Sequence, residues 1–368
     1  MADYTAIDNP SEYFSTTLYT GDGSADQSMT GAGFKPDFLW IKRRNASERH
    51  VLTNVQMGVS SGAYKWLDSA DTHIDFSGGT GVASFDSDGF TIKTSDSTWN
   101  ANGSTYVFWS WKANGGTTTS VSASGTGSGC VNACTYQANT TSGVSIITYT
   151  GRDDQLNNAQ ESKLTHGLGV APSVFICKRR DGTSNWYYLG GNMSTVNNGW
   201  NNVHLLLNQT AGANGNSYTS NTEPDSTYIY LGNQLVNTTD DWVGYAFAEK
   251  QGYSKFGTYY GNASTNGEFI YLGFKPALVI FKVLSDPNYG WSMADAERSP
   301  HNQMNDNIYA NSDVAETTDA IKCDFFSNGV KLRGSTYPAN AGGTNTFAYF
   351  AFAENPFVTS TGVPTTAR

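Results

Sequence analysis

The sequence is poor in charged residues and lacks the features that mark membrane-spanning or nucleic-acid-binding proteins. Only 15% of its 368 residues are charged, and its formal net charge is −10. It has no apolar run of roughly eighteen residues, the minimum for a transmembrane helix, and no basic stripe that could neutralise a phosphate backbone. We therefore expect neither membrane insertion nor a nucleic-acid partner.

Motifs that carry catalytic chemistry are also missing. None of the five histidines lies in a nucleophile motif such as Gly-x-Ser-x-Gly, and the Walker and dinucleotide-binding fingerprints are absent. The 32 acidic residues must supply some carboxylate pairs. The sequence does not say which of them approach within the roughly 5–9.5 Å that glycoside hydrolysis requires. We therefore predict that the protein is not an enzyme and has no cofactor.

Cysteine is scarce, and its four copies do not form a metal-binding pattern. Cys177 and Cys323 lie among apolar strand residues and are interpreted as small core side chains. Cys130 and Cys134 share one loop without a histidine or a second cysteine pair nearby, which argues against zinc. We interpret them as two free thiols, with a disulfide outside the cell as the alternative.

The sequence does contain one motif written three times. In each copy, a glycine and a proline precede a short apolar strand that ends in lysine, as in Gly33 to Lys42. Each copy closes on an aromatic strand, and the distance from the proline to its last aromatic residue is 75, 75 and 76 residues. Insertions in loops cost little and would otherwise vary this distance, so we expect three homologous modules. The prolines and closing aromatic residues are Pro36 and Trp111, Pro172 and Phe247, and Pro276 and Phe352.

Composition divides the chain around these modules. Each module is long enough to have its own core, and we expect its exterior to be free for contact. The segment between the first two modules is rich in glycine, serine and threonine, which predicts a flexible linker. The predicted parts are a leader or attachment segment (1–15), module 1 (16–116), the linker (117–142), module 2 (143–250), module 3 (251–357) and a weakly ordered tail (358–368).

Short apolar runs between polar turns predict strands throughout the modules. Phe38 to Lys42 follows a proline and leads into a polar turn and a returning run, which is typical of a hairpin. No segment shows sustained helical periodicity with caps. We therefore predict an all-β chain of three tandem antiparallel β-sandwich modules, with a jelly-roll, lectin-like topology in each.

Several segments resemble a widespread family of virion structural proteins of marine tailed bacteriophages. They include Ile7–Phe14, Gly33–Asp37, Phe85–Phe90, Ala248–Gly257 and Ala351–Phe357, and the likeness covers nearly the whole chain. Proteins of this family are encoded among virion genes and are usually described as tail, fibre or lectin-like. The resemblance implies a virion location after synthesis in the host cytoplasm, and it carries no catalytic residue to this chain.

One turn could form part of a calcium site. Asp86, Asp88 and Gly89 match the start of a calcium-binding loop, but the remaining ligands of that loop are missing. The third module has Ser327–Gly329 in the same place. A turn before a strand explains the aspartates and the glycine equally well. We therefore interpret the segment as a turn and keep calcium as the alternative.

A lysine follows the motif proline by six residues in every module, at Lys42, Lys178 and Lys282. Such a lysine could present a cation to a sugar acid or to a partner carboxylate. Repetition in every module favours a structural role instead. In that role the lysine would end a strand, keep its ammonium in water, or pair with Glu249 or Glu354 of a closing strand.

Aromatic side chains are the candidates for glycan binding, because a flat apolar ring can stack on a sugar face. His50, Trp186 and Trp291 occupy equivalent places at the start of the returning strand. Trp66 and Trp99 have no obvious counterpart in the other modules and are freer to be functional. Burial in the core is the alternative for all of them, since a sandwich this rich in aromatic residues must bury most of them.

From these features we predict a non-enzymatic structural protein exposed on a phage particle. The hypothesis that we favour is a tail-fibre or tail-tip component whose repeated weak sites bind host-surface glycans with avidity. A capsid decoration or head-fibre protein that stabilises or protrudes from the capsid is the alternative, and a glycan depolymerase is the third. The expected partners are other virion proteins, and the rotational symmetry of phage appendages favours a homotrimer.

Overall fold

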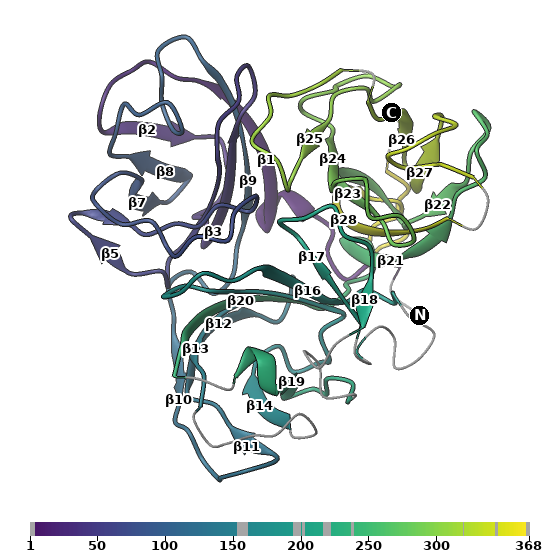
Figure 1. Ribbon diagram of the computed structural model, residues 1–368. Helices are drawn as coiled ribbons and strands as arrows, with labels where there is room; N and C mark the ends of the chain where they lie inside the picture. Colours follow the sequence, from purple (N-terminus) through teal and green to yellow (C-terminus); the bar gives the residue numbers. More distant parts are fainter. Residues whose placement is uncertain are drawn as a thin grey trace.

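The computed structural model describes residues 4–152, 161–193, 200, 203–215, 222–236, 239–318, 320–342 and 345–365. The predicted all-β class is confirmed. Regular structure in these residues consists of strands and of the short 3-10 turns η1 (Pro10–Glu12) and η3 (Asn233–Leu235). The strands form three lobes around a common centre (Figure 1). The jelly-roll, lectin-like topology stays a prediction.

Lobe 1 is built from a larger and a smaller antiparallel sheet. Its strands are β1 (Phe14–Thr20), β2 (Gln27–Thr30), β3 (Phe38–Arg43), β4 (His50–Asn54), β5 (Val59–Ser60), β6 (Ala63–Tyr64), β7 (Val82–Asp86), β8 (Gly89–Ile92) and β9 (Thr105–Trp111). The larger sheet has the order β1-β9-β3-β4 and the smaller one the order β2-β8-β7, while β5 and β6 form a short hairpin.

Lobe 2 has the widest sheet. Its strands are β10 (Thr119–Val121), β11 (Cys130–Val131), β12 (Cys134–Asn139), β13 (Val144–Thr150), β14 (Glu161–Thr165), β15 (Val174–Arg179), β16 (Trp186–Gly190), β17 (Val203–Leu206), β18 (Asn214–Gly215), β19 (Tyr228–Gly232) and β20 (Asp241–Phe247). The larger sheet has the order β10-β12-β13-β20-β15-β16-β17-β18, and the smaller one the order β11-β14-β19.

Lobe 3 again combines a larger and a smaller sheet. Its strands are β21 (Ser254–Tyr260), β22 (Phe269–Tyr271), β23 (Phe274–Val283), β24 (Ser292–Asp295), β25 (Ile308–Tyr309), β26 (Cys323–Phe326), β27 (Gly329–Leu332) and β28 (Thr346–Pro356). The larger sheet has the order β21-β28-β23-β24-β25, and the smaller one the order β22-β27-β26. β21 is therefore at the edge of the larger sheet, and β22 is at the edge of the smaller sheet.

The three larger sheets repeat the same pairing and the same register. In each, the closing aromatic strand (β9, β20 or β28) lies between two strands and is antiparallel to both. One neighbour is β1, β13 or β21, and the other is β3, β15 or β23, the strand at the motif proline. A slip of one residue would turn every side chain to the other face, so the constant spacing in the sequence preserves which face each residue occupies. Opposite Trp111 lie Phe14 and Phe38, opposite Phe247 lie Val144 and Val174, and opposite Phe352 lie Ser254 and Leu278.

A hydrophobic cluster fills the space between the two sheets of each lobe. In lobe 1 it joins Leu39 and Phe108 of the larger sheet to Val82 and Phe90 of the smaller one. Corresponding clusters lie in lobe 2 and in lobe 3. Each lobe therefore has an apolar interior of its own.

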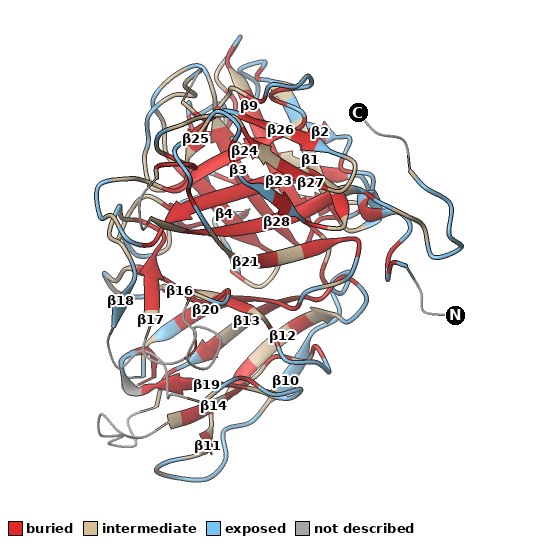
Figure 2. Cartoon of the chain, turned by 90° about the vertical axis from the view of Figure 1, so that its right-hand side faces the viewer, coloured by how far each residue is buried: buried red, intermediate tan, exposed pale blue. Residues whose placement is uncertain are grey.

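The opposite faces of the three larger sheets meet in one further cluster at the centre of the molecule (Figures 1 and 2). This central cluster contains Trp40 and Trp109 of lobe 1, Tyr245 of lobe 2, and Phe256 and Phe350 of lobe 3. Each lobe thus has its own core, as predicted, but the expectation that the exteriors of the modules are free for contact is wrong for these faces of the larger sheets. The closing strands are apolar on both faces because one face is buried inside the lobe and the other against the neighbouring lobes.

Residues 117–142 do not form the flexible linker that their composition predicts. β12 pairs with β13 and is itself paired with β10, while β11 pairs with β14 of the smaller sheet. Cys134, Tyr136 and Ala138 alternate with polar residues along β12, and all three pack on the cluster between the sheets of lobe 2. The segment therefore closes the edges of both sheets of lobe 2.

The described parts of the leader and the tail lie beside lobe 3. Ile7 belongs to the central cluster, and the backbone N–H of Ala6 donates a hydrogen bond to the carbonyl of Gln251 at 2.9 Å. In the tail, the N–H of Ser360 donates to the Asp8 carboxylate at 2.6 Å. The two ends of the chain are therefore held to each other and to the third lobe.

Candidate functional site

The three repeated lysines are buried where the lobes meet. None of them is accessible to solvent, and each ammonium donates a hydrogen bond to the carbonyl of the next residue. Each also donates to a carbonyl of another lobe, so the lysines link lobe 1 to lobe 3, lobe 2 to lobe 1 and lobe 3 to lobe 2 in a closed cycle. These bonds run from Lys42 to Asp313 (3.2 Å), from Lys178 to Thr72 (3.1 Å) and from Lys282 to Thr210 (2.8 Å).

The structural role that repetition favoured for Lys42, Lys178 and Lys282 fits this geometry, but neither the expected surface position and carboxylate partners nor the sugar-acid alternative does. A buried ammonium cannot reach a sugar acid in solvent, and the proposed carboxylate partners are engaged elsewhere. Glu354 pairs with Lys275 at 2.6 Å, and Glu249 accepts the backbone N–H of Phe256 at 2.8 Å. Burial away from water lowers the pKa of each of the three lysines to about 8.

His50, Trp186 and Trp291 follow the same cycle and are also buried. The ring N–H of Trp186 donates to the carbonyl of Asp68 in lobe 1 at 2.7 Å, and that of Trp291 to the carbonyl of Leu206 in lobe 2 at 2.9 Å. The expectation that these side chains stack on a glycan is therefore wrong. Their rings fill the central cluster, and their polar atoms join neighbouring lobes.

His50 makes the corresponding link from lobe 1 to lobe 3. Its Nδ1 accepts the indole N–H of Trp40 at 2.9 Å, so the proton is on Nε2, which lies 3.1 Å from the carbonyl of Tyr309. Burial lowers the pKa of His50 well below its ordinary value. The imidazole is therefore neutral and replaces the indole that the other two lobes use.

Trp66 is buried inside lobe 1 rather than exposed. Its ring stacks on Phe76 with centroids 4.1 Å apart and meets Trp99 edge-on at 5.6 Å. Only 5% of Trp66 is accessible to solvent. It is a core residue of lobe 1, and no sugar can stack on its face.

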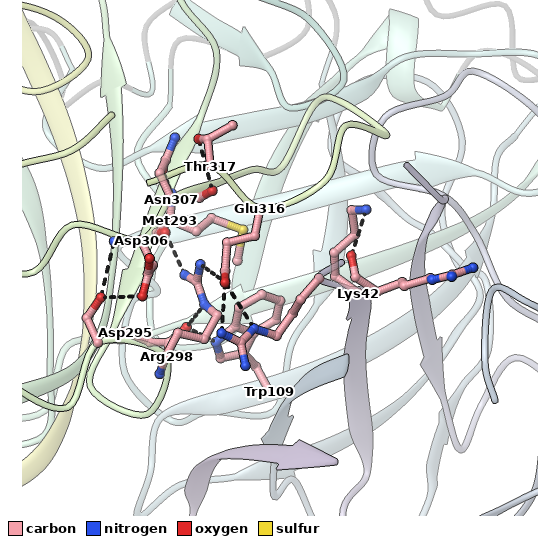
Figure 3. A network of polar contacts seen from close by, with 12 residues as sticks. Lys42, Trp109, Met293, Asp295, Arg298, Asp306, Asn307, Glu316 and Thr317 are labelled. Carbon is pink, nitrogen blue, oxygen red and sulfur yellow. Dashed lines mark hydrogen bonds and ion pairs between the residues drawn. The ribbon is translucent and has the colours of Figure 1, made fainter. Parts of the chain in front are cut away.

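A buried ion network joins lobe 1 to lobe 3 (Figure 3). The fully buried guanidinium of Arg298 lies 2.5 Å from Asp295 and 3.1 Å from Glu316, and the ring of Trp109 lies 5.7 Å away. Glu316 also binds Arg44 of lobe 1 at 2.7 Å. Both carboxylates are held by arginines, so the pair serves to join the lobes and not as an acid and a base.

The junction between lobes 2 and 1 has a related ion pair. There Arg180 binds Asp75 at 3.0 Å. At both junctions the acidic residue also donates its backbone N–H to the carbonyl of its arginine, from Glu316 to Arg44 and from Asp75 to Arg180, each at 2.8 Å. The third junction has the corresponding backbone bond, from the N–H of Ala213 to the carbonyl of Leu284 at 2.9 Å, and among the described residues no ion pair accompanies it.

The turn considered for calcium uses its carboxylates within the protein. Asp88 accepts the N–H of Gly33 at 2.7 Å, and Asp86 accepts the hydroxyls of Ser84 and Thr91, each at 2.8 Å. Across the residues that the structure describes, no group of three or more His, Cys, Asp and Glu side chains is arranged to hold a metal ion. The geometry therefore favours the structural turn.

The four cysteines are buried thiols, and no disulfide joins Cys130 to Cys134. Burial raises the pKa of Cys134 to about 11 and raises the pKa of Cys177 and Cys323 as well. A thiol that stays protonated is a weak nucleophile and a weak metal ligand. These side chains act as small core residues, as the sequence indicated for Cys177 and Cys323.

The exposed aromatic side chains of the described residues gather on lobe 3 and the chain ends packed beside it. Lobes 1 and 2 have no Phe, Trp or Tyr side chain that is exposed to a comparable extent in the ranges given above. Tyr260 at the end of β21 is 70% exposed, and Tyr271 at the end of β22 is 55% exposed. The others are Tyr4, Phe269, Phe326 and Phe357.

Two adjoining hollows lie along the edge formed by β21 and β22. The first has a volume of about 380 Å³ and is lined by Thr258, Tyr260, Glu268 and Phe269, among others. The second, of about 430 Å³, is lined by residues of the leader, β21 and the tail, including Tyr4, Lys255 and Phe357. Tyr271 lines both. We call these two hollows and the rings around them the lobe 3 groove.

The sequence analysis missed this groove, although the repeats contain a signal for it. Tyr260 follows Tyr259 and precedes a glycine, at the place where the other two copies have Thr20 and Thr150. An aromatic residue that appears in only one of three equivalent positions is not required by the shared fold. A comparison of the three modules residue by residue would have identified it.

Comparisons with known proteins add a family but no activity. Among the described residues, no helix is long and apolar enough to cross a bilayer. No curated protein and no solved structure matches the chain. A family model described as a domain of unknown function, DUF7483, matches residues 9–356. That match spans the three lobes, and the chain therefore belongs to the DUF7483 family.

Proposed function

We propose that the chain is a non-enzymatic structural protein of a phage virion, exposed on the particle as a tail-fibre or tail-tip component that binds host-surface glycans through the lobe 3 groove. The observation that supports a binding role is the concentration of exposed aromatic side chains on this one lobe. Apolar rings on a protein surface are unfavourable in water unless a ligand covers them. Their position on a rigid edge is suited to recognition.

The chemistry of the groove fits a sugar. Tyr260, Phe269 and Tyr271 offer ring faces, while Thr258 and Glu268 place a hydroxyl and a carboxylate in the same hollow. Glycan sites combine such stacking surfaces with a few polar groups that fix orientation. The candidates chosen from the sequence, Trp66, Trp186, Trp291, His50, Lys42, Lys178 and Lys282, have no part in this site.

Binding to host cells tests the proposal. Purified wild-type protein should bind to host cells, and Tyr260→Ala or Tyr271→Ala should weaken binding at least tenfold, as truncation of a central aromatic contact does. Val59→Ala is the matched control, because Val59 is 57% exposed but lies on lobe 1. Undiminished binding by both tyrosine variants would exclude the groove, and absence of wild-type binding would exclude host attachment.

Antibody labelling of intact particles tests the location. Label on the tail supports the proposed role. Label on the head would support the alternative, a capsid decoration or head-fibre protein. The cyclic arrangement of three similar lobes favours that alternative to some extent, since it matches a threefold axis of a capsid.

A further inference from the structure

The two hollows of the lobe 3 groove meet at Tyr271, which lines both of them. Ser254 and Lys255 at the start of β21 line one hollow, and Thr258, Tyr259 and Tyr260 at its end line the other. Six residue steps along a strand cover about 20 Å, which is the length of several sugar rings in a row. A ligand that contacts both hollows must therefore be extended.

Tyr271 lies between the two hollows and is held in place by Lys255. The ammonium of Lys255 donates to its carbonyl at 2.9 Å and lies 5.3 Å from its ring centroid. These contacts hold the tyrosine in place while more than half of it stays exposed. A ring that is fixed before binding loses little conformational entropy when a ligand covers it.

In lobe 2, the chain itself covers the edges that correspond to β21 and β22 of lobe 3. There β12 pairs with β13 and β11 pairs with β14, so both edge strands gain a neighbour. The chain enters lobe 3 directly from β20, through residues 248–253, and supplies no equivalent of β11 or β12. In the part of the chain that the structure describes, no strand therefore pairs with the free edge of β21 or of β22.

An added polypeptide strand is not the ligand that this edge favours. The carboxylate of Glu249 accepts the backbone N–H of Phe256, and Lys255 binds the carbonyl of Tyr271. Both are backbone groups that a new strand could have used, and charged side chains at an edge oppose strand addition. What the edge offers instead is a row of ring faces.

The charges of the groove select among glycans. Glu249 lines one hollow and Glu268 the other, and the one cation among the residues that line them, Lys255, is engaged by Tyr271. The hollow around Glu268 has no Lys or Arg among its lining residues, so a sugar acid would meet like charge there without a compensating cation.

We propose that the lobe 3 groove binds a linear, uncharged oligosaccharide lengthwise along β21 and β22, with Tyr271 stacked at its middle and Tyr260 near one end. This inference rests on the proposed function, whose glycan ligand it defines by length and charge. Affinity should therefore rise with the number of sugar rings until both hollows are filled. A terminal monosaccharide should bind weakly.

An array of linear oligosaccharides tests this inference. The probes are glucose and N-acetylglucosamine oligomers of one to six rings, with galacturonic acid oligomers as the acidic counterpart. Wild-type protein should bind neutral chains of four or more rings at least tenfold more tightly than the corresponding single sugars. Tyr271→Ala should abolish this binding, Tyr260→Ala should remove only the gain from the longer chains, and Val59→Ala should change nothing. Glu268→Gln should improve binding of the acidic series.

Each other outcome overturns the inference. Equal affinity for one ring and for six, or preference for the acidic series by wild-type protein, contradicts the lengthwise neutral ligand. Binding of a peptide with the sequence of residues 130–140, with serine for cysteine, at this edge would show that the site takes a strand. Host-cell binding without any neutral oligosaccharide binding would refute this inference and leave the proposed function standing. Absence of host-cell binding would refute the proposed function itself.

Discussion

Three buried lysines should make this protein more stable as the pH rises from 7 to 9. Burial lowers the pKa of Lys42, Lys178 and Lys282 to about 8, whereas in the unfolded chain each has its ordinary value of 10.5. Between these values the unfolded state binds more protons than the folded state, and the free energy of unfolding then increases with pH. The direction is opposite to that expected for lysines held by salt bridges.

The magnitude follows from the two pKa values. One unit of pKa corresponds to about 1.4 kcal/mol, and between pH 7 and 9 each lysine should add about 1.3 kcal/mol, or roughly 4 kcal/mol for the three together. The buried thiols oppose this, because burial raises the pKa of Cys134, Cys177 and Cys323 and the unfolded thiols ionise first. Their opposing contribution over the same range is roughly 1 kcal/mol in total, so a net gain of about 3 kcal/mol is expected.

Denaturant unfolding at pH 7, 8 and 9, in reducing buffer, measures this gain. Lys282→Met is the informative variant, because methionine keeps most of the apolar stem and removes the titrating group. It leaves the carbonyls of Thr210, Val283 and Tyr289 without their donor, so its stability at any one pH will be lower. The quantity of interest is the change with pH, which should fall by about one third of the lysine contribution.

Lys275→Met is the matched control, since Lys275 pairs with Glu354 at the surface side of β23 and belongs to no junction between lobes. It should leave the change with pH as in the wild type. A wild-type stability that is flat or falls between pH 7 and 9, or an unaltered pH dependence in Lys282→Met, would refute the reasoning.

Three further predictions concern the junctions and the leader. Trp291→Ala should lower the free energy of unfolding by about 3–5 kcal/mol, and calorimetry should show all three lobes still melting in one shifted transition. Melting of lobes 1 and 2 at their original temperature would contradict the shared central cluster. Arg298→Ala leaves the Asp295 carboxylate buried without its counter-charge, while Glu316 keeps Arg44, and it should cost about 3–5 kcal/mol in denaturant unfolding. A loss below about 1 kcal/mol would mean that the network is dispensable. Ile7→Ala should lower the free energy of unfolding by about 2–5 kcal/mol. Removal of the leader should therefore lower the melting temperature, in addition to any effect on attachment to particles. An unchanged melting temperature would favour the leader as a separate attachment segment.

The strand framework could be predicted because it depends on local signals that repeat. A proline before an apolar run, a polar turn after it and an aromatic strand at constant spacing give the same pairing and register in all three lobes, as the positions opposite Trp111, Phe247 and Phe352 show. The strands of the segment 117–142 escaped because its few inward-facing residues, Cys134 and Tyr136 among them, are outnumbered by glycine, serine and threonine.

The central cluster and the site could not be predicted from one strand at a time. Trp186 and Trp291 are apolar and repeated, which indicates burial, but the sequence does not say whether a neighbouring sheet or a ligand covers them. The same holds for the lysines, whose carbonyl partners lie in another lobe and far away in the chain. Tyr260 and Tyr271 are functional candidates only because the structure leaves their rings uncovered, and exposure is a property of the assembled fold.

The three lysine hydrogen bonds, each from one lobe to a carbonyl of another, form a closed cycle that limits how the number of repeat copies can change during evolution. In an open array, a repeat unit can be gained or lost at an end, because each unit needs only its neighbours. Here lobe 3 donates to lobe 2, lobe 2 to lobe 1 and lobe 1 to lobe 3. Loss of one copy would leave a lysine without its carbonyl acceptor, and insertion of a fourth would separate a donor from its acceptor. Divergence must then proceed by substitution within a fixed number of copies. The hydrogen bond between Ser360 and Asp8 places the segment before lobe 1 beside the segment after lobe 3, so a circular permutation of the three copies would keep the cycle intact.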